Sequence, residues 1–183
     1  MGNNMFAYCG NNPIRFSDHG GCYPLEVAFE FLEKWITGDG KTQKYTDGSR
    51  IVKKLKRSDK MESHIKSAID NYKNGQSTTI GTDEFTAEED GYELFLSTQH
   101  FDYTITVTEE SRTVGILWWK HEEVRYIATV TVHDEYNFDT FRECNSFGNI
   151  MNNIAYIYHF LGGGKDFEWY ATYTYTTKWE DAT

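Results

Sequence analysis

The stretch FDYTITVT, residues 101–108, places an apolar or aromatic side chain at every second position. Phe101, Tyr103, Ile105 and Val107 share one face, whereas aspartate and threonine occupy the other. The stretch VRYIATVTVH, residues 124–133, alternates in the same way. A period of two is typical of an antiparallel strand with one buried and one solvated face. We therefore expect two such strands to form the centre of the fold.

Further strands of a meander are expected around this pair. Residues 109–111 and 121–123 have the polar character of hairpin tips, which makes TVGILWW (113–119) a strand of its own between them. The chain from residue 92 onward is expected to enter this meander. DFEWYATYTYTTKW (166–179) is expected to be the last strand. The sheet would then contain about five strands.

Helical spacing of apolar residues predicts three helices. The first covers residues 24–36 and ends at Gly38 and Gly40; the second begins with Ser58 or Asp59 as N-cap and ends before residues 74–75. The third covers residues 146–161. The predicted fold class is therefore α+β: an antiparallel meander sheet with two N-terminal helices and one later helix packed on it. Residues 22–183 are expected to form one domain.

Charge and cysteine content restrict the class of protein. The net charge is −10: residues 22–76 carry 11 Lys/Arg and 8 Asp/Glu, whereas residues 77–183 carry 6 and 19. The acidic half disfavours nucleic acid as a partner, because phosphate-binding proteins present a basic face. The three cysteines lack the CxxC spacing of a zinc site. No apolar run reaches the roughly 18 residues of a spanning helix, and no signal peptide opens this chain.

The N-terminal stretch carries a specific pattern. GNNMFAYCGNNP (2–13) is followed by four residues and then by DHGG (18–21). This string resembles the end of the Rhs (YD-repeat) core, which has Gly-x-Asn-x-Tyr-x-Tyr-x-x-Asn-x-Pro, four residues and Asp-Pro-x-Gly. The matching residues are Asn4, Phe6, Tyr8, Asn11 or Asn12, Pro13, Asp18 and Gly21. His19 stands where that family has proline.

The resemblance implies a division of the chain and a role. Residues 1–21 would be an extended or loop-like remnant of the Rhs core, and residues 22–183 the variable tip released from it. Such tips are antibacterial toxins used in interbacterial competition. They are delivered into target bacterial cells and neutralised by a cognate immunity protein. The partners implied are that immunity protein and the parent Rhs shell. The chemistry of the toxin is not implied, because unrelated tips follow the same core.

Histidine and carboxylate residues at strand ends are the candidate catalytic group. His100 and Asp102 are two positions apart on one strand face, and His133 continues a similar face before the chain leaves the sheet. Strands paired in register would bring these three together. Two histidines and a carboxylate suffice for metal-free acid–base chemistry, or they hold a divalent cation with acidic neighbours; solvated strand ends are the alternative. The candidate catalytic set is His100, Asp102, His133, Asp134, Tyr136 and Asp139.

A polar stripe on the third predicted helix supplies candidate substrate-binding residues. Asn149, Asn152, Tyr156 and His159 follow one another at helical spacing, opposite the apolar stripe. Amide, hydroxyl and imidazole groups can orient a substrate or an oxyanion. An ordinary exposed helix face has the same pattern. The basic cluster from Arg50 to Lys60 is a candidate contact for phosphates or anionic lipid head groups, or a solvated face.

Three hypotheses for function follow. The first is an enzymatic toxin, a His/Asp acid–base or metal-assisted hydrolase with an unidentified substrate and cofactor. The second is a membrane-disrupting toxin without enzymatic activity, which the high aromatic content permits. The third is a binding or adhesion module. The aromatic pair Trp118-Trp119 is expected to pack in a core and a second layer, with an aromatic rim for a ligand or membrane interface as the alternative.

Overall fold

The computed structural model describes residues 26–86, 92–98, 100–137 and 147–182. The resemblance at residues 2–21, the three cysteines and the start of the predicted domain lie outside the described residues. The chain divides into two compact units, and each is built from three segments. The first unit contains the described parts of residues 1–43, 84–100 and 134–169, and the second contains residues 44–83, 101–133 and 170–183.

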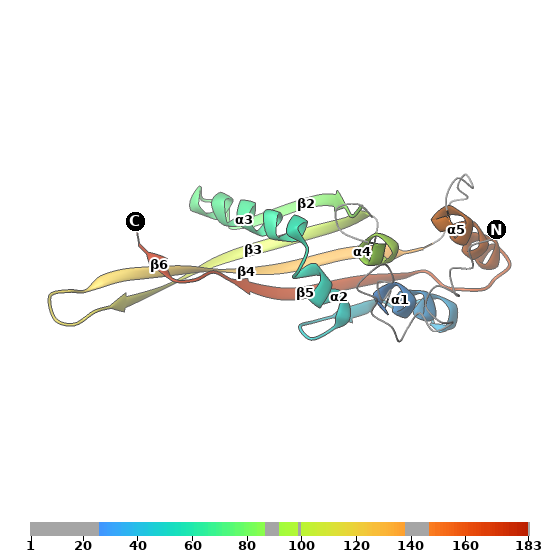
Figure 1. Cartoon of the computed structure of the whole chain (residues 1–183), viewed down its shortest axis with the longest axis horizontal. Coiled ribbons are helices and arrows are strands. Elements are labelled where there is room, and N and C mark those ends of the chain that lie inside the picture. Colours follow the sequence, from blue (N-terminus) through green and yellow to red (C-terminus); the bar gives the residue numbers. More distant parts are fainter. Residues whose placement is uncertain (1–25, 87–91, 99, 138–146, 183) are drawn as a thin grey trace, which may run out of the picture. The chain divides into compact units, whose positions relative to one another are not determined.

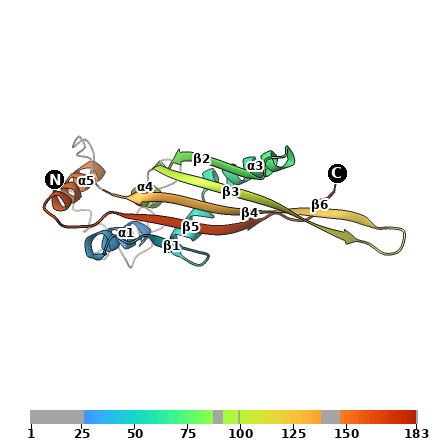
Figure 2. The same ribbon diagram turned by 180° about the vertical axis from the view of Figure 1, so that it is seen from behind.

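The fold is α+β, as the sequence predicts, and Figures 1 and 2 show its elements from two opposite sides. Strands β1 (Gln43–Tyr45), β5 (Phe167–Thr176), β4 (His121–Tyr136), β3 (His100–Val114) and β2 (Thr78–Glu84) neighbour one another in that order. A sixth strand, β6 (Glu180–Asp181), pairs with β4. The sheet is mixed rather than purely antiparallel, which corrects the all-antiparallel expectation.

Three described helices confirm the predicted ones. They are α1 (Glu26–Thr37), α3 (Asp59–Lys73) and α5 (Phe147–Phe160). Ser58 is the N-cap of α3, since its hydroxyl accepts a hydrogen bond from the Met61 amide at 3.3 Å. Two short helices, α2 (Arg50–Leu55) and α4 (Tyr92–Ser97), and the strand β2 occur where the sequence analysis expected no such element.

The hairpin tips predicted at 109–111 and 121–123 are wrong. Residues 109–111 lie inside β3 and residues 121–123 lie inside β4, so these two strands run directly into each other through residues 115–120. TVGILWW is therefore not a separate strand. Its first two residues end β3, and Gly115 to Trp119 belong to the turn.

An aromatic cluster forms the core of the first unit. The Phe31 ring of α1 meets the rings of Tyr136, Phe167 and Trp169 edge-on, with centroids 5.3–5.8 Å apart. One turn further along α1, the Trp35 indole N–H donates to the Asp166 carboxylate at 2.8 Å. Perpendicular and tilted ring pairs of this kind contribute beyond their buried area.

In the second unit, α3 lies against one face of the strands β2, β3 and β4 (Figure 1). Its apolar stripe is buried with the alternating apolar residues of β3 and β4: Met61, Ile65, Ala68, Ile69, Ile105, Val107, Ala128, Val130 and Val132. The predicted in–out alternation of both strands is confirmed. Beyond residue 108 no residue of β3 is buried.

Candidate functional site

The strand register brings Asp102 and His133 directly opposite each other. His133 Nδ1 lies 3.9 Å from Asp102 Oδ2, which is an ion-pair separation and too long for a hydrogen bond. The imidazole stacks on the Tyr170 ring with centroids 4.3 Å apart, and its Nε2 is buried without a hydrogen-bond partner among the described residues. This arrangement provides an oriented Asp–His pair on the face of the sheet opposite α3.

Two further residues of the predicted catalytic set, His100 and Asp134, contact other side chains in the first unit. His100 is largely exposed, and its Nδ1 lies 3.5 Å from Glu84 Oε2. Asp134 accepts a hydrogen bond from the Thr98 hydroxyl at 2.5 Å and another from the Glu135 amide at 2.7 Å. The carboxylate of Asp134 is thus held by local donors at the end of β4.

Tyr136 is a core residue rather than an accessible acid or base. Only 9 % of it is exposed, and its ring packs against Phe31 and Phe167. Burial raises the pKa of its hydroxyl well above the ordinary value for tyrosine. Asp139, the last member of the predicted catalytic set, lies outside the described residues.

The predicted polar stripe on α5 is only partly described. The side chains of Asn149 and Asn152 lie outside the described set, and Tyr156 is half-buried. His159 meets the Trp35 ring edge-on at 5.8 Å, and its Nδ1 lies 3.7 Å from Asp166 Oδ1. His159 therefore belongs to the polar border of the first unit's aromatic core.

A second Asp–His pair, which the sequence analysis missed, joins α3 to β2. His64 Nε2 and Asp83 Oδ2 are 2.8 Å apart, and the imidazole stacks on Tyr103 with centroids 4.3 Å apart. Tyr103 in turn lies so close to Gly81 that a Cβ there would meet its hydroxyl at 2.5 Å. The pair was missed because TTIGTDE lacks strand alternation, so Asp83 was not placed on any element.

The turn between β3 and β4 exposes four consecutive large apolar side chains. Ile116, Leu117, Trp118 and Trp119 are exposed by 77 %, 67 %, 83 % and 80 %. We call these four residues the apolar tip. Gly115 has φ 116° and Leu117 has φ 54°, and the Trp119 amide donates to the Ile116 carbonyl at 3.1 Å. The expectation that Trp118 and Trp119 pack in a core is therefore wrong, because the turn carries them away from every buried layer.

Behind the apolar tip, residues 110–114 of β3 and 121–125 of β4 form a ribbon that begins beyond the buried Tyr126 and is fastened by charge pairs. The short strand β6 pairs with β4 at Glu123 and Val124. Arg112 donates to Glu123 at 2.6 and 2.8 Å, and the Arg125 guanidinium contacts Glu110 at 2.6 and 2.7 Å. Both guanidinium groups lie over the Trp179 ring, at 4.2 and 4.6 Å from its centroid. The ribbon thus keeps its shape without a hydrophobic core.

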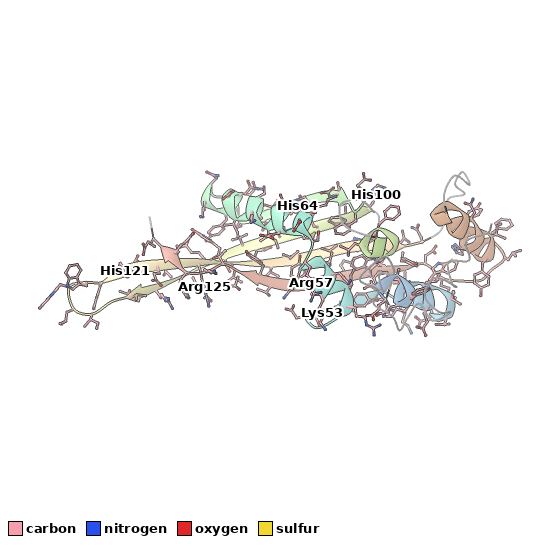
Figure 3. The ribbon with its side chains drawn as sticks, in the orientation of Figure 1. Lys53, Arg57, His64, His100, His121 and Arg125 are labelled. Atoms are coloured by element: carbon pink, nitrogen blue, oxygen red, sulfur yellow. The ribbon has the colours of Figure 1, made fainter. Side chains whose placement is uncertain are left out.

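The basic cluster around α2 lies elsewhere in the second unit. Lys53 and Arg57 are exposed (labelled in Figure 3), and Lys56 pairs with Asp47 at 2.5 Å.

A shallow cleft of about 410 Å³ lies between α3 and the ribbon and is lined by Tyr72, Lys73, Glu109, Val124, Tyr126, Glu180 and Asp181. Within it, Lys73 pairs with Glu180 at 3.2 Å and lies over the Tyr126 ring.

Comparison of the chain with protein-family models, with curated proteins and with solved structures finds no match. None of the described helices has both the length and the apolar character needed to cross a membrane.

Proposed function

We propose that this chain carries the toxin domain of an Rhs-type polymorphic toxin, and that the domain acts at the membrane of the target bacterium through its apolar tip. The toxin role is supported by the resemblance of residues 2–21 to the end of the Rhs core. The membrane role is supported by one observation, the exposure of Ile116, Leu117, Trp118 and Trp119 in a single turn. Delivery into the target cell and neutralisation by an immunity protein belong to the same proposal.

The residues of the apolar tip suit the boundary between lipid and water. Tryptophan is enriched at that boundary because its ring is apolar and its N–H remains near water. Full burial of a large apolar side chain is worth roughly 1.5–3 kcal/mol. Partial insertion of four of them therefore supports weak, reversible attachment. Scattered surface hydrophobes need no explanation, but a contiguous exposed set marks an interaction site.

The ribbon behind the tip limits how deeply the domain can insert. Its strands carry two arginines and two glutamates in paired positions, and moving charged pairs into hydrocarbon is costly. The geometry therefore favours a tip that enters the interface while the charged ribbon stays in water. Because the chain has a net charge of −10, attachment should depend on apolar contact rather than on anionic lipid.

Vesicle binding tests this proposal. The full chain should sediment with zwitterionic phosphatidylcholine vesicles at high salt, and brominated lipid should quench its tryptophan fluorescence. Trp118→Ser/Trp119→Ser should weaken sedimentation at least about tenfold and remove the quenching. Ile80→Ser is the matched control, because Ile80 is 75 % exposed but lies on β2 in the second unit's sheet. Equal binding by the double variant and the wild type would contradict the proposal.

Expression in target bacteria links binding to toxicity. Wild-type protein directed to the cell envelope should depolarise the membrane before growth stops, and the tryptophan double variant should do neither. Depolarisation by both proteins would show that the apolar tip is not the membrane-active element.

An enzymatic toxin is the second candidate, and the register of Asp102 with His133 favours it. In this case Asp102, whose side chain is 63 % exposed, is the member of the pair that exchanges a proton with the substrate, and His133 faces its carboxylate through Nδ1. His133→Ala and Asp102→Asn should abolish toxicity while the membrane potential persists early in wild-type expression. Full toxicity of both variants would remove this candidate.

A further inference from the structure

At the end of the ribbon nearest the apolar tip, three side chains from two strands direct metal-binding atoms toward one another. They are His121 and Glu123 on β4 and Asp181 on β6. One nitrogen or oxygen from each lies within 4.8 Å of the other two. His121 is labelled on this part of the ribbon in Figure 3. We infer that these residues bind one divalent cation, with Zn²⁺ as the best-suited probe.

The distances around His121 match those expected between two ligands of one ion. Its Nε2 lies 3.4 Å from Glu123 Oε1 and 3.5 Å from Asp181 Oδ1. Both separations exceed an ordinary N–H···O bond. Two ligand atoms that each lie about 2.1 Å from a tetrahedral zinc ion are about 3.4 Å apart. One imidazole and two carboxylates are ligands that zinc accepts, and the fourth position would remain open to water.

Arg112 leaves the metal-facing oxygen of Glu123 available. Both of its hydrogen bonds go to Glu123 Oε2, at 2.6 and 2.8 Å, whereas Oε1 is the atom nearest His121. The guanidinium thus orients the carboxylate from behind, as an outer-shell partner does in metal sites.

The pairing of β6 with β4 places Asp181 beside Glu123, within reach of the proposed cation. Glu123 and Asp181 are register partners, and the Ala182 amide donates to the Glu122 carbonyl at 2.9 Å. β6 is only two residues long and both are exposed; apart from its backbone pairing it is held by the ion pair of Glu180 with Lys73. A cation shared by both strands would fasten β6 to β4 beside the tip. This site does not depend on whether the tip binds lipid.

Calorimetric titration of the full chain with Zn²⁺ tests the inference. The wild type should bind one equivalent of Zn²⁺ at this site. The variants His121→Ala and Asp181→Asn should bind that equivalent at least about tenfold more weakly or not at all. His100→Ala is the matched control, because His100 is also an exposed histidine beside one glutamate but belongs to no three-residue ligand group among the described residues. Any zinc bound by the three cysteines is common to all variants and cancels in the comparison.

Hydrogen exchange supplies an independent readout. Zn²⁺ should slow exchange of the Ala182 amide in the wild type and in His100→Ala, and should leave it unchanged in His121→Ala. Arg112→Gln should weaken zinc binding about tenfold without removing it, since it removes the hydrogen bonds that orient Glu123 but leaves all three ligands in place. Equal zinc stoichiometry and affinity in the wild type and in His121→Ala would overturn the inference.

Discussion

The strands β3 and β4 keep one antiparallel register from Asp102↔His133 to Val114↔His121, yet the two ends of this pair are stabilised differently. Near residues 101–108 and 127–133 the pair is covered by α3, and Ile105, Val107 and Val130 are fully buried. Beyond residue 109 the same ladder continues as the ribbon, held by two arginine–glutamate pairs and Trp179. Backbone pairing therefore continues where burial stops, and the ribbon is left to carry the exposed tip.

This difference separates residues needed for folding from residues available for the proposed membrane contact. In the α3-covered part, each apolar residue is needed for packing, and changing it costs stability. In the turn, four apolar residues contribute nothing to a core, so folding alone does not account for them. The comparison predicts large stability effects in the covered part and mainly binding effects at the tip.

The largest effect on stability is expected when Val130 of β4 is replaced by alanine, and the same replacement at Val124 of β4 is the comparison. Val130 is fully buried and Val124 is half-buried in the ribbon. Val130→Ala should lower the free energy of unfolding by about 2 kcal/mol, because it removes buried methyl groups and leaves a cavity. Val124→Ala should cost less than about 1 kcal/mol. Denaturant titration of both variants measures the difference, and equal losses would show that the ribbon has a core of its own.

The sequence predicted the α3-covered part of β3 and β4 well. Alternation in FDYTITVT and VRYIATVTVH gave the correct buried faces, and helical spacing with Ser58 gave α3 and its cap. These features depend on local periodicity, which is visible without knowledge of tertiary contacts. By contrast, α2, α4 and β2 are short and lack clear periodicity, so their formation depends on packing against the rest of the chain.

The position of the turn was mispredicted although the sequence contains a signal for it. The apolar run ILWW was interpreted as a strand, and the charged residues on either side as tips. Glu110 and Arg125, and likewise Arg112 and Glu123, stand at equal distances from the middle of that run with opposite charges. Complementary charges placed symmetrically about an apolar run after glycine predict cross-strand pairs and a turn between them.

The Asp–His pairs show the limit of spacing arguments. Asp102 and His133 were placed on comparable strand faces by alternation, so their register partnership followed from two correctly assigned strands. His64 and Asp83 come from a helix and an unrecognised strand, and only the tertiary packing brings them within 2.8 Å. The proposed metal ligands could not be grouped from the sequence either, because Asp181 lies on β6, which was not predicted as a strand.

Alkaline pH should weaken the second unit through Tyr173 on β5. Burial raises the pKa of its hydroxyl far above the ordinary value of 10.0. The unfolded chain therefore ionises first, and stability that is complete below pH 10 is lost as pH rises toward the folded-state pKa. Each such phenol should remove about 1.4 kcal/mol of unfolding free energy per pH unit in that range.

Tyr173→Phe isolates this contribution. The buried hydroxyl has no hydrogen-bond partner in the described part of the chain, so the variant should equal or exceed the wild type in stability at pH 7. Between pH 10 and 11 it should lose less stability than the wild type by about 1 kcal/mol, because the unfolded phenol is already half ionised at pH 10. Denaturant unfolding at pH 7, 10 and 11 provides the comparison. Identical pH profiles for the two proteins would mean that Tyr173 ionises while folded.

The smallest effect is expected from the charge pairs of the ribbon. A double-mutant cycle with Arg112→Ala and Glu123→Ala should give only a small coupling energy, since both groups are partly exposed and water screens them. The same variants should nonetheless accelerate hydrogen exchange of the ribbon amides, including Val124, far more than that of Val130. A ribbon without a core has only these local contacts to keep it closed, whereas α3 protects the covered part. Equal acceleration at both ends would show that β3 and β4 open as one unit, and the contrast between their two ends would not extend to their dynamics.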